Sequence, residues 1–174
     1  MIDDKSYSCN EIMGLPVIKQ SDFNALLYHT VVAISDSKKR EKVVQSLPED
    51  TIYTKIIHNN SLISKWVEIG EGAIISAGVI LTHNITIGIH AHLNLQTTIG
   101  HDCKIGNYFT SAPGVKISGN CIIGDNVYLG TNSCLKQGIE ICDNVVVGMG
   151  AVVVKDLSEP GVYVGTPARK LVKK

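Results

Sequence analysis

The sequence predicts a mainly β protein, a left-handed parallel β-helix of hexapeptide repeats preceded by a small N-terminal α/β segment. From position 61 to position 156, the 174-residue chain divides into sixteen six-residue units without an insertion. The third position of these units is Ile, Leu or Val everywhere except at Ser111. A period of six fits neither an α-helix nor the simple alternation of a half-buried strand. A large aliphatic residue followed by a small one instead suits a short, flat strand that ends at a tight corner.

Three such units close a triangular coil of eighteen residues, and successive coils stack as parallel strands about 4.8 Å apart. The aliphatic side chains are expected to fill the interior of this prism. Glycine is frequent at the fourth position, as at Gly70 and Gly88, and we expect it to permit the corner dihedrals that a side chain would penalise. Residues eighteen apart in sequence therefore lie in one column, as neighbours in successive coils.

The segment before the repeats has a different pattern. Residues 30–35, "TVVAIS", are typical of a buried strand, and residues 36–47 of a helix with Asp36 or Ser37 at its N-cap. Residues 21–27 suggest a shorter helix capped by Ser21 or Asp22. We expect this unit to pack on the first coil and cover its open strand edge. The predicted domains are a partial, apparently truncated α/β segment (1–60), the β-helix (61–157), and a C-terminal strand with a basic tail (158–174).

Composition excludes several classes of partner. Lys and Arg together number 16 and so do Asp and Glu, which leaves a net charge of zero and no electrostatic reason to expect nucleic acid or an anionic membrane. No apolar run approaches the roughly 20 residues that span a bilayer. The polar N-terminus, "MIDDKSYSCN", does not resemble a signal peptide, so a cytoplasmic location is expected. The five cysteines lack zinc-site spacing and are predicted to be free thiols.

One repeat unit, "TTIGHD", departs from the bland pattern by placing His101 beside Asp102. The columns set this pair at a corner outside the core, with Gly119 one coil beyond the histidine. A solvated turn histidine is the plain structural alternative. His83, His90 and His92 are the conceivable metal ligands, but they occupy unmatched positions and no acidic cluster joins them, so no metal site is predicted. The columns concerned are His83, His101 and Gly119; Asn84, Asp102 and Asn120; and Cys103 and Cys121.

The repeats, together with "IGHDCKIG", "KISGNCIIGDNVYLGTNSCL" and "GVYVGTPAR", resemble bacterial acetyl-CoA-dependent sugar acetyltransferases. The resemblance is greatest to UDP-4-amino-sugar N-acetyltransferases of the bacillosamine type and to sialic acid O-acetyltransferases. It implies that His101 is the general base for the acceptor and that Asp102 orients its imidazole, which suits a group that titrates near neutrality. It also implies that the backbone N–H of Gly119 binds the thioester oxygen as charge develops.

The same resemblance implies the remaining site residues and partners. Acetyl-CoA is the expected co-substrate, and the expected assembly is a homotrimer with active sites between subunits. The expected reaction is acetyl transfer to the amine of a nucleotide-linked amino sugar in the biosynthesis of a surface polysaccharide or glycan. Residues expected to line the acetyl-CoA site are Gly119, Thr131, Gly148, Met149, Gly150, Gly165 and Pro167; those expected to contact the acceptor are Asp3, Asp4 and Asn94.

The chain departs from this family at two places. The glycine-rich nucleotide loop that usually precedes the acidic pair Asp3–Asp4 is absent, and Thr110 stands where many relatives carry a second histidine. Three other functions therefore remain open. They are O-acetylation of a sialic acid or another sugar hydroxyl, a non-catalytic β-helix scaffold, and a zinc carbonic anhydrase on the same fold.

Overall fold

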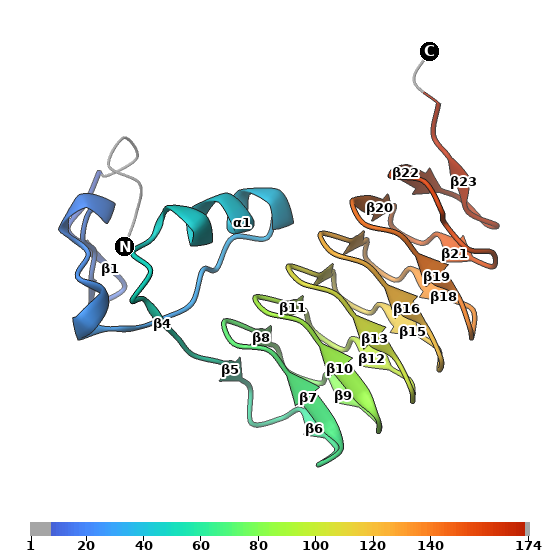
Figure 1. Cartoon of the computed structure of the whole chain (residues 1–174), viewed down its shortest axis with the longest axis horizontal. Coiled ribbons are helices and arrows are strands. Elements are labelled where there is room, and N and C mark those ends of the chain that lie inside the picture. Colours follow the sequence, from blue (N-terminus) through green and yellow to red (C-terminus); the bar gives the residue numbers. More distant parts are fainter. Residues whose placement is uncertain (1–7, 173–174) are drawn as a thin grey trace.

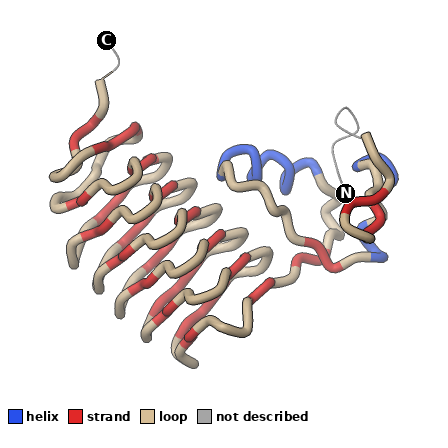
Figure 2. Tube along the Cα trace, turned by 180° about the vertical axis from the view of Figure 1, so that it is seen from behind, coloured by secondary structure: helices blue, strands red, loops and turns tan. Residues whose placement is uncertain are grey.

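The computed structural model describes residues 8–172, so Asp3 and Asp4 lie outside the described residues. Stacked coils form a long solenoid, with the N-terminal segment beside its first coils and the C-terminal strands at the far end (Figure 1). The view from behind shows short strands joined by tight turns throughout the stack (Figure 2). The predicted β-helix is confirmed. Within residues 8–172, no helix is both long and apolar enough to cross a bilayer.

Three faces enclose the core, and we name each by its first strand. Strands eighteen residues apart pair in parallel, for example Thr98 with Lys116 and Lys116 with Cys134. The β5 face holds β5 (Ile56–Ile57), β8 (Ile74–Ile75), β11 (His92–Leu93), β14 (Thr110–Ser111), β17 (Tyr128–Leu129), β20 (Val145–Val147), β22 (Gly161–Val164) and the antiparallel β23 (Arg169–Lys170). The β6 face holds β6 (Leu62–Ile63), β9 (Ile80–Leu81), β12 (Thr98–Ile99), β15 (Lys116–Ile117), β18 (Cys134–Leu135) and β21 (Val152–Val153). The β7 face holds β7 (Val67–Ile69), β10 (Ile85–Ile87), β13 (Lys104–Ile105), β16 (Ile122–Ile123) and β19 (Glu140–Ile141).

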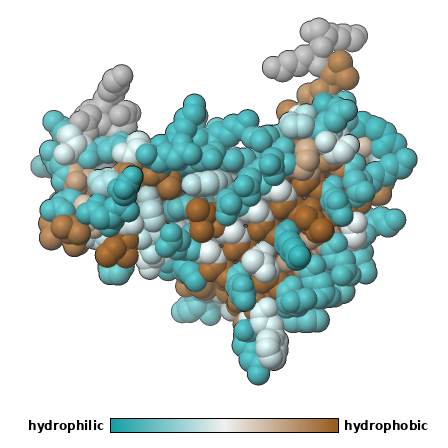
Figure 3. Space-filling model, in the orientation of Figure 1, coloured by the Kyte–Doolittle hydropathy of each residue, from teal (hydrophilic) through white to brown (hydrophobic). Residues whose placement is uncertain are grey.

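The core is built from the first and third positions of the repeat. First-position side chains such as Val79, Val115 and Val127 have no exposed surface, and third-position side chains such as Ile99 and Leu129 have almost none. Each coil therefore buries two apolar side chains on every face. Removing apolar surface from water stabilises the fold by roughly 25 cal/mol per Å². On the outer surface, apolar patches over the stacked strands alternate with hydrophilic side chains (Figure 3).

The corners correct one sequence-based expectation. The left-handed backbone conformation falls on the sixth position of the repeat, where φ is +54° at Asn84 and +58° at Asp102, and not on the fourth-position glycines. Asn, Asp and Gly dominate the sixth position because they tolerate this conformation. The fourth-position glycines serve a different purpose, close approach between coils. A Cβ on Gly100, for instance, would lie 2.6 Å from the backbone nitrogen of Gly119.

The N-terminal segment contains a small parallel β-α-β unit. It consists of β3 (His29–Thr30), α1 (Ser37–Ser46) and β4 (Ile52–Tyr53), with β3 paired to β4. The predicted helix at 36–47 is confirmed, and Asp36 caps it by accepting a 2.9 Å hydrogen bond from the Lys39 backbone N–H. A two-stranded hairpin, β1 (Glu11–Ile12) and β2 (Leu15–Pro16), precedes the unit.

Two predictions for this segment are wrong in detail. The strand covers residues 29–30 and not 30–35, because the chain leaves β3 for the α1 cap before it can pair further. The expected helix over 21–27 is instead two 3-10 turns, Gln20–Asp22 and Ala25–Leu27, and the second is capped by Asn24 and not by Ser21 or Asp22. An Asn in the middle of this short stretch competes for the backbone N–H of Leu26 and interrupts a continuous helix.

Helix α1 packs on the β5 face at the third and fourth coils, and not on the first coil as expected. Fully buried Arg40 fastens it, donating hydrogen bonds to the carbonyl oxygens of Ile34 and Tyr108 (2.6 Å each) and to Thr110 Oγ1 (2.9 Å). Burial lowers the pKa of Arg40 to about 10, so it remains a cation at neutral pH. Backbone carbonyl oxygens surround this guanidinium in place of a carboxylate. Their hydrogen bonds with Arg40 fix the position of the helix along the solenoid.

Candidate active site

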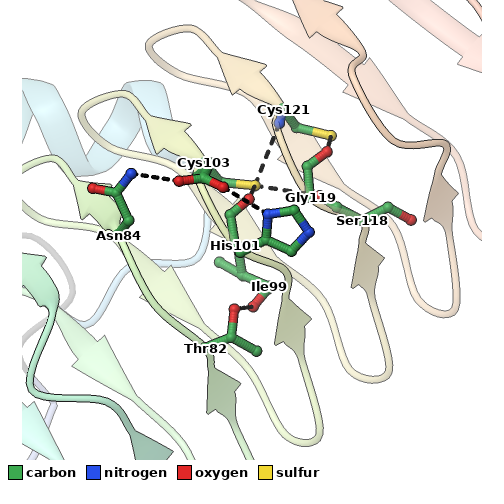
Figure 4. A network of polar contacts seen from close by, with 9 residues as sticks. Thr82, Asn84, Ile99, His101, Cys103, Ser118, Gly119 and Cys121 are labelled. Carbon is green, nitrogen blue, oxygen red and sulfur yellow. Dashed lines mark hydrogen bonds and ion pairs between the residues drawn. The ribbon is translucent and has the colours of Figure 1, made fainter.

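The edge between the β6 and β7 faces, which we call the base edge, brings the predicted catalytic residues together. His101 and Asp102 occupy one corner turn, and Gly119 occupies the next turn in the same column. The Asn120 backbone N–H donates to the His101 carbonyl at 2.8 Å, which fixes the two turns in register. Figure 4 shows the His101 imidazole lying toward Gly119.

The His101–Asp102 pair has the geometry of an oriented base. His101 Nδ1 lies 2.7 Å from Asp102 Oδ2, so Nδ1 carries the proton that the carboxylate accepts and Nε2 keeps its lone pair. The two side chains are 43% and 39% exposed, which leaves the ring open to a substrate. Hydrogen bonds from Asn84 and then from His101 lower the pKa of Asp102, so the carboxylate is ionised at neutral pH.

Gly119 is required at its position by the imidazole. A Cβ there would lie 2.7 Å from both Cε1 and Nε2 of His101. The Gly119 carbonyl accepts a hydrogen bond from Gly138, whereas no described residue accepts one from its N–H. The base nitrogen therefore lies against Gly119, whose backbone N–H has no hydrogen-bond partner among the described residues, and acyl transfer needs a base and an oxyanion donor close together.

The coil before the dyad supports it with two residues that the sequence analysis placed in these columns without a role. Asn84 Nδ2 donates a 2.5 Å hydrogen bond to Asp102 Oδ1 (Figure 4). The His83 ring stacks on the His101 ring, with centroids 5.7 Å apart and planes at 17°. The signal that could have found them is the eighteen-residue column itself, because a side chain one coil away contacts its column neighbour.

Apart from Gly119, the residues expected to line acetyl-CoA lie on a different edge, between the β5 and β6 faces, which we call the glycine edge. The Gly150 N–H donates to the Thr131 carbonyl at 2.8 Å, and the Val152 N–H donates to the Gly165 carbonyl at 3.1 Å. Met149 on this edge is 81% exposed. Asn94, the expected acceptor contact, is exposed on the same edge and accepts a 2.9 Å hydrogen bond from Leu95. The chain thus gathers Thr131, Gly148, Met149, Gly150, Gly165 and Pro167 along one edge, and the whole β6 face separates them from His101.

Two other expectations concern side chains away from the dyad. Thr110 lies on the β5 face, where its hydroxyl donates to the Ser35 carbonyl and accepts from Arg40, so it serves the attachment of α1. The five cysteines are free, and Cys103 and Cys121 are buried in one column beneath the dyad. Among residues 8–172, no group of three or more His, Cys, Asp or Glu side chains could hold a metal ion.

Two hollows mark the surface near these edges. A cavity of about 400 Å³ at the base edge is lined by Lys65, Trp66, Glu68, His83 and Asn84, and therefore shares its wall with the dyad. A second one, of about 430 Å³, lies between the start of α1 and the β5 face.

Comparison with known proteins agrees with the repeat pattern and the fold. The family described as "Hexapeptide repeat of succinyl-transferase" matches residues 59–83 and 120–155. GDP-perosamine N-acetyltransferase of Escherichia coli O157:H7 is 40% identical over 109 residues, which cover 62% of this chain and 49% of that protein. The chain therefore spans about half the length of that curated relative.

Solved structures extend the similarity over nearly the whole chain. WeeI from Acinetobacter baumannii AYE is 36% identical with a TM-score of 0.88, covering 97% of this chain and 84% of that one. PerB from Caulobacter crescentus, solved in complex with CoA and GDP-perosamine, is 27% identical with a TM-score of 0.88, covering 94% and 82%. Repeat and overall structure agree, and the chain belongs to the family of hexapeptide-repeat sugar acetyltransferases.

Proposed function

We propose that this protein transfers the acetyl group of acetyl-CoA to the amino group of a nucleotide-linked amino sugar, in the biosynthesis of a surface polysaccharide or glycan. The observation that carries the proposal is the His101–Asp102 pair packed against Gly119, whose N–H has no hydrogen-bond partner among the described residues. The relatives support the substrate class, because the E. coli protein is named for GDP-perosamine and the Caulobacter protein was solved with CoA and GDP-perosamine. A cytoplasmic location belongs to this proposal.

The residues of this chain account for each proton and charge in the reaction. Acetyl-CoA supplies an activated thioester. As the acceptor nitrogen bonds to the acetyl carbon, His101 Nε2 takes the proton that the nitrogen loses. Asp102 stabilises the resulting imidazolium through Nδ1, and the Gly119 N–H donates to the oxygen on which negative charge develops. His101 then gives its proton to the departing CoA sulfur and returns to its neutral form.

The glycine edge fits the slender pantetheine arm of acetyl-CoA. Space is open beside Gly150, since a Cβ there would meet no atom within 4 Å. Thr131, Gly148, Met149, Gly150, Gly165 and Pro167 would border the arm and present backbone groups and short side chains to it. Along the solenoid axis, Pro167 on the glycine edge lies about three coil spacings of 4.8 Å beyond the level of Gly119 on the base edge. A long, narrow ligand suits such a path, and its reactive end belongs beside Gly119.

We further propose a homotrimer with shared active sites. The base edge and the glycine edge of one chain flank the β6 face, so neither edge reaches the other. A threefold arrangement with the β6 faces turned inward brings the base edge of one subunit against the glycine edge of the next. Exposed apolar side chains on this face, Leu62 (66%) and Ile80 (39%), support its burial between subunits.

The test is acetyl transfer by the purified chain to a panel of amino-sugar nucleotides, including GDP-perosamine, followed by thiol release and mass spectrometry of the sugar. The expected result is N-acetylation of at least one acceptor, slowed by about 10²–10⁴ in His101→Ala. O-acetylation is the second candidate, because galactoside O-acetyltransferase of E. coli K12 is 26% identical to this chain. That alignment covers 90% of this chain and 89% of that protein. Galactosides and sialic acids belong in the same panel. Failure to acetylate any acceptor would favour a scaffold function.

A further inference from the structure

The cavity at the base edge has a composition unlike the rest of this edge. It measures about 400 Å³ and combines an aromatic side chain, Trp66, with two oppositely charged ones, Lys65 and Glu68. Trp66 is 66% exposed, and the Lys65 ammonium lies 4.9 Å from the centroid of its ring. Neither Lys65 nor Glu68 forms an ion pair with another residue in the range 8–172. An indole combines an apolar body with a polar N–H, and ligand pockets are lined mainly by apolar and aromatic side chains with a few convergent polar groups.

The cavity is joined directly to the proposed base. Its far wall is formed by His83, which stacks on His101, and by Asn84, which donates to Asp102. Along the solenoid axis it lies on the N-terminal side of the dyad. Gly119 and the residues proposed for acetyl-CoA lie on the C-terminal side or level with it. The two reactants must meet at His101 from different directions, so the N-terminal side is left for the acceptor.

We propose that this cavity binds the pyranose ring of the acceptor, with Trp66 as the surface on which the ring packs. The inference rests on the proposed function and adds the position and recognition chemistry of the sugar. A pyranose presents C–H groups on its faces and hydroxyls around its rim. The indole of Trp66 can pack against the C–H groups. Lys65 can donate hydrogen bonds to the hydroxyls, and Glu68 can accept hydrogen bonds from them.

Spacing along the solenoid is compatible with this assignment. Trp66 and Asp102 stand two coils apart in one column, which is roughly 10 Å at about 4.8 Å per coil. A pyranose is about one coil spacing wide, so a ring seated between Trp66 and His83 extends its amino substituent toward the coil that carries His101. From there the amine has to pass the His83 ring to reach Nε2, and the exposed cavity mouth leaves room for the nucleotide.

Trp66 is the single tryptophan of the chain, and its fluorescence therefore reports on this cavity alone. We would titrate the His101→Ala protein, in the absence of acetyl-CoA, with GDP-perosamine, with GDP and with CoA, correcting for absorption by the nucleotides. The expected result is a saturable change in emission with the amino-sugar nucleotide and little change with GDP or CoA. A change of equal size with GDP would show that the indole contacts the nucleotide and would overturn the proposal. Binding detected by calorimetry without any change in emission would also overturn it.

Kinetics give a second, independent test. Trp66→Ala should raise the KM for the acceptor at least tenfold while kcat and the KM for acetyl-CoA stay within about twofold, and Trp66→Phe should recover part of the affinity. Leu27→Ala is the matched control, because Leu27 is 71% exposed but lies on the N-terminal 3-10 turn away from the cavity. An unchanged acceptor KM in Trp66→Ala would refute this inference and leave the proposed function intact. A wild-type protein inactive toward every acceptor would refute the function itself.

Discussion

Asn84 donates a 2.5 Å hydrogen bond to Asp102, the residue eighteen positions further along the chain and directly above it in the next coil. Both residues hold the left-handed corner conformation, with φ of +54° and +58°. The other oxygen of Asp102 faces His101 Nδ1 at 2.7 Å. The carboxylate is thus held between an amide donor from one coil and an imidazole from its own, and its orientation depends on the stacking of the solenoid.

This relationship predicts the effect of changing Asn84. Asn84→Gly preserves the backbone conformation but removes the donor, and kcat should fall about tenfold, since a hydrogen bond to a charged group contributes about 1.5–3 kcal/mol. Asn84→Asp also suits the corner but places a second carboxylate beside Asp102. The decrease in kcat should therefore be larger in Asn84→Asp than in Asn84→Gly. Steady-state kinetics with saturating acetyl-CoA measure both.

The two variants separate positioning from plain structural support. If Asn84 only stabilised the corner, both variants would keep wild-type kcat, because Gly and Asp both tolerate a positive φ. The His83 ring, which stacks on His101, is unchanged in both proteins.

His101 itself should carry the proton transfer. His101→Ala is expected to lower kcat by about 10²–10⁴, the usual contribution of a positioned general base, with the affinity for acetyl-CoA nearly unchanged. Asp102→Asn should lower kcat by a smaller factor, because it weakens the orientation of the His101 imidazole without removing the base. Near-wild-type turnover by His101→Ala on the preferred acceptor would contradict the assignment.

Gly119 offers a steric test of the same site. Its Cβ in Gly119→Ala would stand 2.7 Å from His101 Nε2, so the ring must tilt away from the backbone donor. We expect a loss in kcat of about 10²-fold, comparable with removal of an oxyanion donor, and little change in the melting temperature. Gln137→Ala, one coil further in the same column and exposed, is the control and should remain active.

The period of the repeat was enough to predict the solenoid, its columns and the corner that carries the dyad. Columns follow from an uninterrupted spacing of eighteen, so His101, Asp102 and Gly119 could be brought together from sequence. The coils on which α1 packs, and the repeat position that carries the left-handed corner conformation, could not be predicted from sequence. Arg40 fixes α1 through carbonyl oxygens of distant coils, which have no sequence signature. A glycine looks the same in sequence whether it permits a positive φ or, as at Gly100, a close approach of backbones.

The attachment of α1 should make the protein sensitive to acid. His90 and His92 pack near Arg40, and burial together with the Arg40 charge lowers the pKa of each to about 4 from 6.5. Because the folded pKa lies below the unfolded one, this stability is complete above about pH 6.5 and is lost as pH falls toward 4. For His90, which is 1% exposed, the shift corresponds to about 3 kcal/mol.

The measurement is the free energy of unfolding in urea between pH 7 and pH 4. His90→Asn keeps a residue that suits the corner at φ of +54° but cannot titrate. It should be less stable than wild type at pH 7, because stacking on Tyr108 is lost, yet lose less stability on acidification. An equal pH dependence in both proteins would show that the carboxylates, and not this histidine, govern acid unfolding.

The shared site predicts complementation between two inactive proteins. His101→Ala disables the base edge and leaves the glycine edge intact. Met149→Asp places a charge on the glycine edge, where Met149 is 81% exposed, and leaves the base edge intact. Each protein alone should have little activity, the first for lack of a base and the second for weak binding of acetyl-CoA. Light scattering should report a trimer for both, since neither residue lies on the β6 face.

Mixed trimers formed by denaturing and refolding the two proteins together should regain activity. In a random equal mixture, half of the base edges and half of the glycine edges are intact, so about one quarter of the paired edges combine two intact partners. Activity should therefore return to about one quarter of wild type, with a KM for acetyl-CoA like that of wild type. A site formed within one chain cannot be restored this way, because every chain carries one defect. Refolded trimers without activity, beside a refolded wild-type control that is active, would refute the shared site.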